Sequence, residues 1–190
     1  MPSGRTHDRI TLWTLPWIVG GSSIATRNGV LTLIVSGAFL FSGLMFGPDL
    51  DIYSVQYKRW GGLRWIWLPY QKMLRHRSYW SHGPIIGTTL RLLYLLSGVG
   101  LVGIFGVAIA QAVWNFPWNW HVFIHRTLDQ LKLHSAEAIA LWIGLELGSL
   151  SHAIADTLGS THQRVRKKGW KDGIFPPKPK KRRRNSPKKR

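Results

Sequence analysis

Histidine and aspartate, which bind divalent metals through nitrogen and oxygen, recur at the borders of apolar segments in this sequence. The 190 residues contain only eight Asp and Glu together and eight His. Imidazole and carboxylate together suit Zn²⁺, Fe²⁺ or Mn²⁺, and an ionised aspartate beside apolar helices needs a cation or a base as its partner. The distribution therefore predicts a divalent-metal site. Its candidate ligands are His7, Asp49, Asp51, His76, His82, His152 and Asp156.

The chain contains no cysteine. Disulfides, thiolate zinc sites, Cys-ligated iron–sulfur clusters and a cysteine nucleophile are thereby excluded. Any metal site must be built from His, Asp and Glu.

The spacing of the candidates favours a shared site. His152 and Asp156 are four residues apart, so on a helix they lie on one face. Asp49 and Asp51 follow Pro48, which stops the preceding helix and leaves both carboxylates on an irregular turn. Pro84, two residues after His82, suits the first turn of the next helix.

Each motif could also have a purely structural role when taken alone. Asp49 and Asp51 could be turn and cap residues. His152 and Asp156 could form a simple hydrogen bond between successive helical turns. His76 could belong to a solvated basic face, His82 could be a cap, and His7 with Asp8 could be an exposed pair. The combination of all these motifs is what favours the metal.

The apolar segments predict an all-α, small integral-membrane helical bundle. Residues 30–47 and 92–114 carry no charge and reach spanning length. Two weaker segments are residues 10–25, interrupted by Pro16 and Gly20-Gly21, and residues 138–155, which carry Glu146. Each of these two could be a span, a re-entrant piece, an interfacial helix or a buried helix. Glu146 needs a partner, for which we consider Arg91 or a metal-bound histidine.

The positive charge lies mostly in a C-terminal tail. The formal net charge is +18, and 14 of the 26 Lys and Arg fall between residues 164 and 190. We expect one membrane-embedded domain, residues 1–160, and a disordered Lys/Arg/Pro-rich tail, residues 161–190. The tail could bind anionic lipid or serve as a topology anchor. Its charge alone gives no nucleic-acid specificity, so no specific nucleic-acid partner is expected.

The same charges predict the orientation. Residues 48–83 contain six Lys and Arg, whereas residues 115–137 contain two. Because basic residues near the ends of spans stay cytoplasmic, residues 48–83 and the tail should be cytoplasmic. The candidate ligands then meet at the cytoplasmic ends of the helices, and His121 and His125 lie on the opposite side.

The motifs SGRTHDRIT (3–11), GPDLDIYS (47–54), LRHRSYWSHGPIIGT (74–88) and SHAIADT (151–157) resemble those of a family of uncharacterised metal-binding membrane proteins common in cyanobacteria. Their order is also similar to that of a wider group of inner-membrane proteins described as metal-dependent hydrolases. The resemblance covers most of residues 1–160. It implies a bound divalent metal and a helical membrane fold, with the ligands at the positions named above except His7, which matches the closer family only.

Two functions follow. The first is a hydrolase in which one or two ions activate water and act on a phosphoester or lipid-type substrate at the cytoplasmic face. The second is a non-enzymatic membrane protein whose metal is structural and whose tail binds lipid or an acidic partner. Water access at the metal discriminates between them, because a structural zinc is closed by protein ligands.

Overall fold

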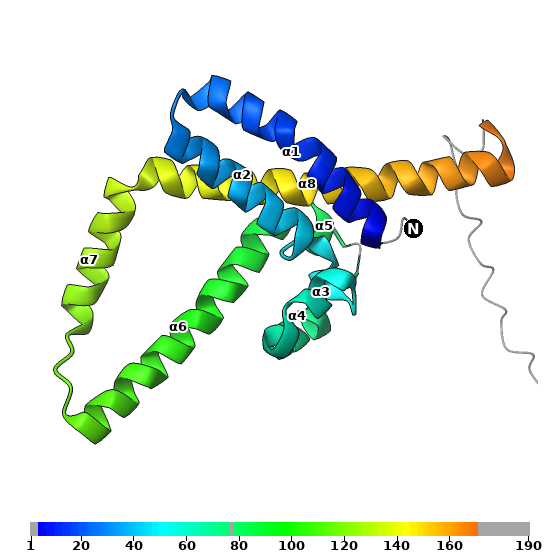
Figure 1. Cartoon of the computed structure of the whole chain (residues 1–190). Coiled ribbons are helices and arrows are strands. Elements are labelled where there is room, and N and C mark those ends of the chain that lie inside the picture. Colours follow the sequence, from blue (N-terminus) through cyan, green and yellow to red (C-terminus); the bar gives the residue numbers. More distant parts are fainter. Residues whose placement is uncertain (1–3, 77, 171–190) are drawn as a thin grey trace, which may run out of the picture.

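A computed structural model describes residues 4–76 and 78–170 and shows an all-α protein, which confirms the predicted fold class (Figure 1). No strand occurs within these ranges. The predicted tail beyond residue 170 lies outside the described residues. The elements in chain order are α1 (Gly4–Thr26), α2 (Gly29–Leu44), η1 (Pro48–Asp51), α3 (Val55–Arg59), η2 (Gly61–Trp67), α4 (Leu68–Met73), α5 (Tyr79–His82), α6 (Ile86–Trp114), α7 (Trp120–Leu133) and α8 (Ser135–Lys168).

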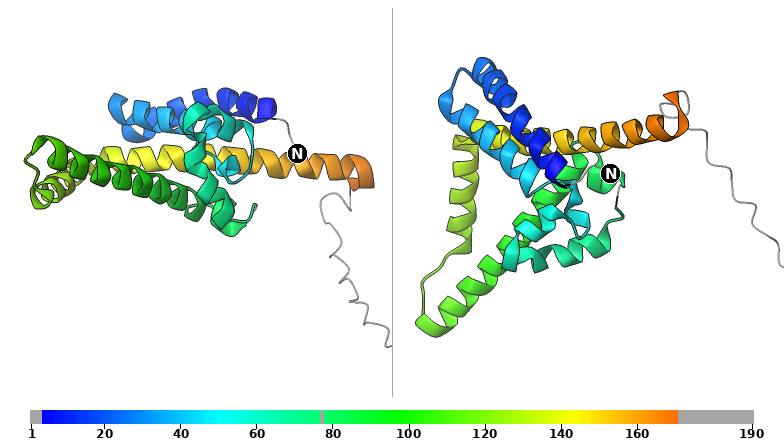
Figure 2. Two further views of the ribbon diagram at one scale, coloured as in Figure 1. Left: turned by 90° about the horizontal axis from the view of Figure 1, so that it is seen from below. Right: turned by 45° about the vertical axis from the view of Figure 1, so that its right-hand side comes forward.

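Helices α1, α2 and α8 form the main bundle (Figures 1 and 2). The turn between α1 and α2 contains Arg27 at φ +48°. Asn28 then caps α2, because its side chain accepts hydrogen bonds from the amides of Val30 and Leu31 at 2.9 and 3.2 Å. Helix α2 packs against both α1 and α8, whereas α1 and α8 contact each other much less.

Glycines set the close approach of α2 and α8. A Cβ atom on Gly144 would lie 2.4 Å from the carbonyl oxygen of Val35, and one on Gly148 would lie 2.5 Å from that of Phe39. The two glycines are four residues apart, so they form one small-residue face of the kind that lets membrane helices approach closely. The hydroxyl of Ser42 donates to the carbonyl of Leu145 at 2.6 Å across the same contact.

Among the described residues, three helical stretches are long and apolar enough to cross a membrane: Gly29–Asp51, Ile86–Trp114 and Ser135–Lys167. They include the apolar segments 30–47, 92–114 and 138–155. The segment 10–25 lies in α1, which is not one of the three. Pro16 and Gly20-Gly21, expected as interruptions, lie inside the continuous helix α1.

The segment between η1 and α6 folds around buried aromatic rings. Trp67 is fully buried and contacts the rings of Phe46, Tyr70 and Tyr94 at centroid distances of 5.7, 5.7 and 5.6 Å. Leu50, in η1, belongs to the same core. This core attaches the Trp-rich segment to the end of α2 and so fixes the position of η1.

Helix α6 leads away from this core, and α7 returns to the start of α8, so that the three helices outline an open triangle (Figure 1). Helix α8 then runs past the main bundle to Lys168. It therefore continues beyond the expected domain boundary at residue 160. Residues 161–168 contain Gln, Arg and Lys but no Gly or Pro, and this helix propensity is the physical reason for the extension. Gly169, at φ +85°, ends the helix.

Candidate metal centre

All seven predicted residues lie in one network, connected by histidine–carboxylate contacts and by the stacking of His7 on His152. They come from the first turn of α1, from η1, from the segment after α4, from the end of α5 and from α8. The contacts are His7 Nε2 to Asp156 Oδ1 at 3.3 Å, His152 Nε2 to Asp49 Oδ2 at 3.2 Å, His82 Nε2 to Asp49 Oδ1 at 3.8 Å, His82 Nδ1 to Asp51 Oδ2 at 3.6 Å and His76 Nδ1 to Asp51 Oδ1 at 2.8 Å.

The short helix η1 holds both aspartates at the end of α2. Pro48 stands at its first position, and Pro48 and Leu50 are buried on the core side. The side-chain amide of Gln71 donates to the carbonyls of Leu50 and Ile52 at 3.0 and 3.1 Å. The buried side chains and the hydrogen bonds of Gln71 together hold the backbone of η1 in place. They therefore fix the positions from which the side chains of Asp49 and Asp51 extend.

Asp51 faces the Nδ1 atoms of two histidines. It is buried, and its two oxygens point to His76 and His82 respectively. Nδ1 of His82 also lies 2.7 Å from the hydroxyl of Ser81. With Nδ1 of each ring engaged, Nε2 of each ring is left without a hydrogen bond to any described residue. This is the arrangement in which an outer carboxylate orients a histidine toward a metal.

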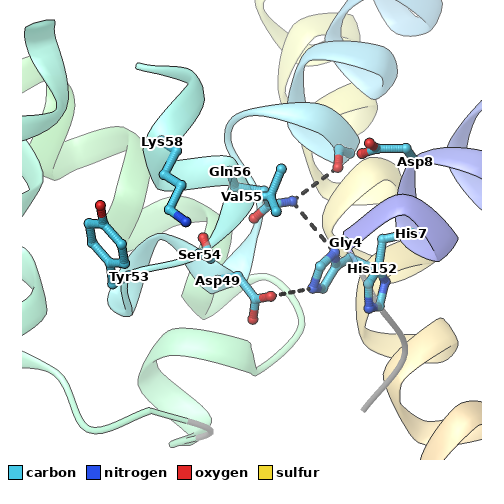
Figure 3. Close-up of a pocket in the computed structure, with 11 residues that line it drawn as sticks. Gly4, His7, Asp8, Asp49, Tyr53, Ser54, Val55, Gln56, Lys58 and His152 are labelled. Atoms are coloured by element: carbon cyan, nitrogen blue, oxygen red, sulfur yellow. Dashed lines mark hydrogen bonds and ion pairs between the residues drawn. The ribbon is translucent and has the colours of Figure 1, made fainter. Parts of the chain in front are cut away.

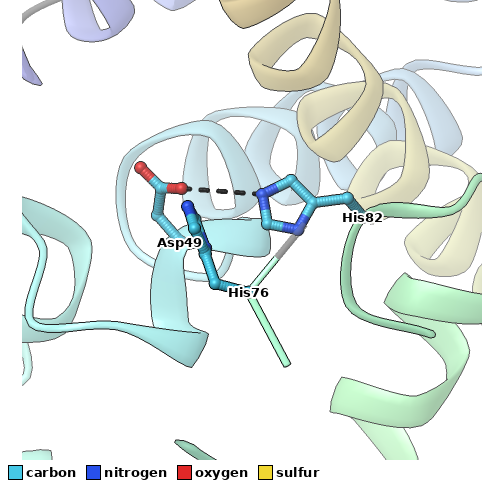
Figure 4. Close-up of side chains that lie close together, drawn as sticks. All are labelled: Asp49, His76 and His82. Carbon is cyan, nitrogen blue, oxygen red and sulfur yellow. Dashed lines mark ion pairs between the residues drawn. The ribbon is translucent and has the colours of Figure 1, made fainter. Parts of the chain in front are cut away.

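Asp49 lies between two groups of side chains that could each hold a metal ion. In the first group, atoms of Asp49, His76 and His82 lie within 4.8 Å of one another (Figure 4). In the second, atoms of Asp49, His152 and Asp156 do so. Oδ1 of Asp49 faces His82 and Oδ2 faces His152, so the two oxygens point to different groups.

His7 joins the second group from α1. Its ring stacks on that of His152 with centroids 4.0 Å apart and an angle of 19°. Burial, and next the neighbouring His152, lower the pKa of His7 below its ordinary value of 6.5. A lowered pKa favours the neutral imidazole, which is the form that binds metals.

The donor set fits a divalent cation. Six buried donor atoms of the candidate residues lack a hydrogen bond within residues 4–76 and 78–170: Asp49 Oδ1, Asp51 Oδ2, His7 Nδ1, His76 Nε2, His82 Nε2 and His152 Nε2. Buried polar atoms are nearly always paired, so such a concentration at one point calls for a bound partner. Imidazole nitrogen with carboxylate oxygen is the set preferred by Zn²⁺, Mn²⁺ and Fe²⁺.

Polar side chains that the sequence interpretation missed support this centre. The amide of Gln56 is buried, donates to the carbonyl of Gly43 at 3.0 Å and lies 3.5 Å from Nδ1 of His152. Nothing in the sequence around Gln56 distinguishes it from a surface residue of a polar loop.

Arg91 and Glu146 hold the segment that carries His82. Arg91 is fully buried and donates to the carbonyl of Ser81 at 2.8 Å and to the hydroxyl of Ser149 at 2.8 Å. Glu146 accepts from the amide of Ile85 at 2.9 Å. Ile85 has φ +66°, a strained value for a β-branched residue. Arg91, one of the two partners expected for Glu146, interacts with it electrostatically, while the hydrogen bond of Glu146 is to the backbone.

A pocket of about 250 Å³ opens beside the second group (Figure 3). His7, Asp49 and His152 line one side, and Tyr53, Ser54 and Lys58 line the other. A further pocket, of about 310 Å³, is lined by His82 and Asp156. The network is therefore reached from two directions.

Comparison with known proteins identifies the family. The family described as "Uncharacterized metal-binding protein (DUF2227)" matches residues 2–166. The chain belongs to this family. Membership in DUF2227 covers the whole network described above, from His7 to Asp156. The chain is also 36% identical over 58 residues to an uncharacterized protein of Aquifex aeolicus (strain VF5), which is 30% of this chain and 40% of that protein's length. No solved structure matches the chain.

Proposed function

We propose that this DUF2227 protein is a metal-dependent phosphoester hydrolase whose two divalent ions share Asp49. One ion would be held by Asp49, His76 and His82, and the other by Asp49, His152 and Asp156 with help from His7. Asp51 would act as the outer carboxylate that orients His76 and His82. When bound, such a pair of ions supplies Lewis-acid stabilisation of phosphate oxygens and a nucleophilic water near neutral pH.

The observation that carries the proposal is the pocket beside Asp49 and His152. A structural metal is closed by its protein ligands, whereas a catalytic one keeps a position for water and substrate. Here Asp49 and His152 line the wall of a pocket of about 250 Å³. The alternative structural role predicts a closed site at this point.

Lys58 would attract an anion into the pocket, since the lining carboxylate of Asp8 is already paired with Arg59. Its side chain lies on the wall opposite the network, with Nζ 4.8 Å from the ring centroid of Tyr53 (Figure 3). An ammonium group binds phosphate as a point charge. Phosphate oxygens would therefore lie between Lys58 and the Asp49–His152 contact.

The proposal includes a membrane location with the centre at the cytoplasmic face. Three helices of spanning length support the membrane location. The orientation is supported by the basic residues, because residues 48–83 contain six Lys and Arg and residues 115–137 contain two. Membrane lipid would then be both the environment and a source of phosphoesters.

The experiment is a hydrolysis assay on the detergent-purified protein with p-nitrophenyl phosphate and Mn²⁺, Zn²⁺ or Fe²⁺, alongside elemental analysis. His152→Asn should lower the rate by at least about 100-fold, because it removes a ligand rather than an outer-shell partner. His125→Asn is the matched control, since His125 lies on α7 and contacts His121 instead. Metal binding that raises thermal stability without any hydrolysis would support the structural role and overturn the proposal.

A further inference from the structure

An apolar groove runs along the main bundle to the candidate metal centre. Its part nearest the centre has a volume of about 490 Å³ and is lined by Ile10 and Ile18 of α1, by Leu147, Ile154 and Leu158 of α8, and by Phe39 of α2. A second part, of about 310 Å³, shares Ile18 and Leu147 with the first and continues to Ala25 and Ile143. The two parts therefore form one groove.

The groove exists because α1 and α8 both pack on α2 and only lightly on each other. Ile10, Thr14 and Ile18 are spaced by four residues and so line it from one face of α1. From Ile143 to Leu158 it extends for about 22 Å, at 1.5 Å per residue of α8. One leaflet of a bilayer core is about 15 Å thick. The groove is thus long enough for a whole acyl chain.

Its lining is less polar than the residue types suggest. The hydroxyl of Thr14 donates to the carbonyl of Ile10 at 2.8 Å, and that of Ser22 donates to the carbonyl of Ile18 at 2.6 Å. Thr26 donates to the carbonyl of Ser22 at 2.8 Å in the same way. Because these hydroxyls bond to their own helix, they offer the groove no free donor; apart from Ser151 and the indole of Trp17, the other lining side chains are hydrocarbon.

One end of the groove lies close to the candidate centre. Ile10 lies one helical turn from His7, and Ala155, which also lines the groove, is adjacent to Asp156. His7 and Asp156 contact each other at 3.3 Å across this end. On the far side of His7 is the polar pocket with Lys58. An amphipathic molecule with its apolar chain in the groove would therefore have its polar end near the metal ligands and near the ammonium group of Lys58.

We propose that the groove between α1 and α8 binds the acyl chain of a membrane lipid whose phosphorylated headgroup is the substrate of the metal centre. This inference rests on the proposed hydrolase function and names its substrate class. A helix, about 10 Å across, does not fit between two helices whose Cα atoms approach within 8 Å of each other. A flexible hydrocarbon chain does.

Gly21 and Gly20 provide a matched pair of variants. Both are in α1, and a Cβ atom on either meets nothing within 4 Å, but only Gly21 lines the groove. Gly21 lies 14 residues from His7, about 21 Å along the helix. Gly21→Phe should therefore fill the distant end of the groove and leave the metal centre unchanged, whereas Gly20→Phe should fill nothing.

The test compares phosphate release from palmitoyl lysophosphatidate, hexanoyl lysophosphatidate and p-nitrophenyl phosphate by the metal-loaded protein in detergent. We expect kcat/KM to favour the palmitoyl over the hexanoyl substrate by about tenfold or more, since each buried methylene is worth roughly a factor of four. Gly21→Phe should reduce this preference, because only the nearer part of the groove stays open, and should retain activity on the other two substrates. Gly20→Phe should behave as the wild type. Equal kcat/KM values for the palmitoyl and hexanoyl substrates would overturn the proposal that the groove binds the acyl chain. The same chain-length preference in Gly21→Phe and Gly20→Phe would also overturn it.

A binding measurement separates failure of the groove from failure of the hydrolase. If p-nitrophenyl phosphate is not cleaved, the proposed function is wrong, and a photoreactive palmitoyl lysophosphatidate still tests the groove. Cross-links on α1 and α8 that unlabelled palmitoyl lysophosphatidate displaces and that Gly21→Phe reduces, while Gly20→Phe does not, would support it. Labelling spread over the exposed helix α6, without displacement, would show lipid that merely surrounds the protein and would overturn the inference.

Discussion

The carboxylate of Asp51 lies 2.8 Å from Nδ1 of His76, and its second oxygen faces Nδ1 of His82 at 3.6 Å. The rings of His76 and His82 are nearly perpendicular, at 80°, with centroids 5.0 Å apart. One buried carboxylate thus faces Nδ1 of both rings, and Nε2 of His82 faces Asp49. Asp49 and Asp51, two residues apart in η1, have distinct roles in the proposed centre.

Asp51→Asn should weaken the metal centre without abolishing it. The amide keeps the shape of the carboxylate but loses one acceptor, so the orientation of His76 and His82 is less well defined. Loss of such an outer-shell partner lowers metal affinity by about 10–100-fold. Titration with Mn²⁺ or Zn²⁺ should show this decrease, while Asp49→Asn should lose tight binding at both positions. Equal loss in the two variants would make Asp51 a direct ligand.

The sequence predicts that these residues lie close together, which the contacts show, but not how they divide into two groups; their role as metal ligands stays a prediction. His7, Asp49, His82 and Asp156 could be found because an ionisable side chain beside an apolar segment is costly unless it has a partner, and because the order of spans brings helix ends together. Which oxygen of Asp49 faces which histidine depends on side-chain rotamers and on the packing around Trp67. No local pattern in the sequence encodes either.

The supporting residues differ in how well the sequence marks them. Arg91 is recognisable as a charge in an apolar helix, and Glu146 likewise. The hydrogen bond from Ile85 to Glu146 is not predictable, because it requires the positive φ of Ile85. Helix α1 continues through Pro16, against the expected interruption, and contacts α2 on both sides of the proline, through Thr11 against Gly43 and Thr26 against Thr32.

Arg91→Met should destabilise the protein. The side chain is fully buried and donates to Ser81, Thr88 and Ser149, all of which would lose a partner. Each unsatisfied buried group costs about 1–3 kcal/mol. We expect a clearly lower melting temperature in detergent and weaker metal binding, because the carbonyl of Ser81 fixes the position of His82. Arg126→Met, on the exposed surface of α7, is the control and should melt like the wild type.

Gly148→Leu should separate α2 from α8. Even a Cβ atom at this position lies 2.5 Å from the carbonyl oxygen of Phe39 and 2.9 Å from the amide nitrogen of Gly43. These are backbone atoms that cannot move aside, so overpacking should cost about 1–3 kcal/mol or more. His152 is one turn further along α8, and metal affinity should fall as well. Gly103→Leu, on α6 where a Cβ atom meets nothing within 4 Å, should leave both properties unchanged.

Acidification should destabilise the metal-free protein partly through His7. Burial lowers the pKa of His7 in the folded state below 6.5, so the unfolded chain binds more protons in the range below that value. Stability should then be fully present above about pH 6.5 and should fall as the pH decreases through the folded pKa. Melting temperatures measured across this range test the sign. His7→Phe keeps a ring against His152 but cannot titrate, and it should reduce the loss; an unchanged pH dependence would contradict the role of His7.

The orientation can be tested directly because the chain contains no cysteine. Leu63 in η2 and Gln130 in α7 are both exposed, and they lie on opposite sides of the proposed membrane. Leu63→Cys should react with a membrane-impermeant maleimide only when the cytoplasmic face is accessible, because its segment carries the excess of Lys and Arg. Gln130→Cys should react only from the other side. Labelling of both cysteines from one side would contradict a spanning arrangement, and reversed labelling would place the metal centre on the opposite face from the one proposed.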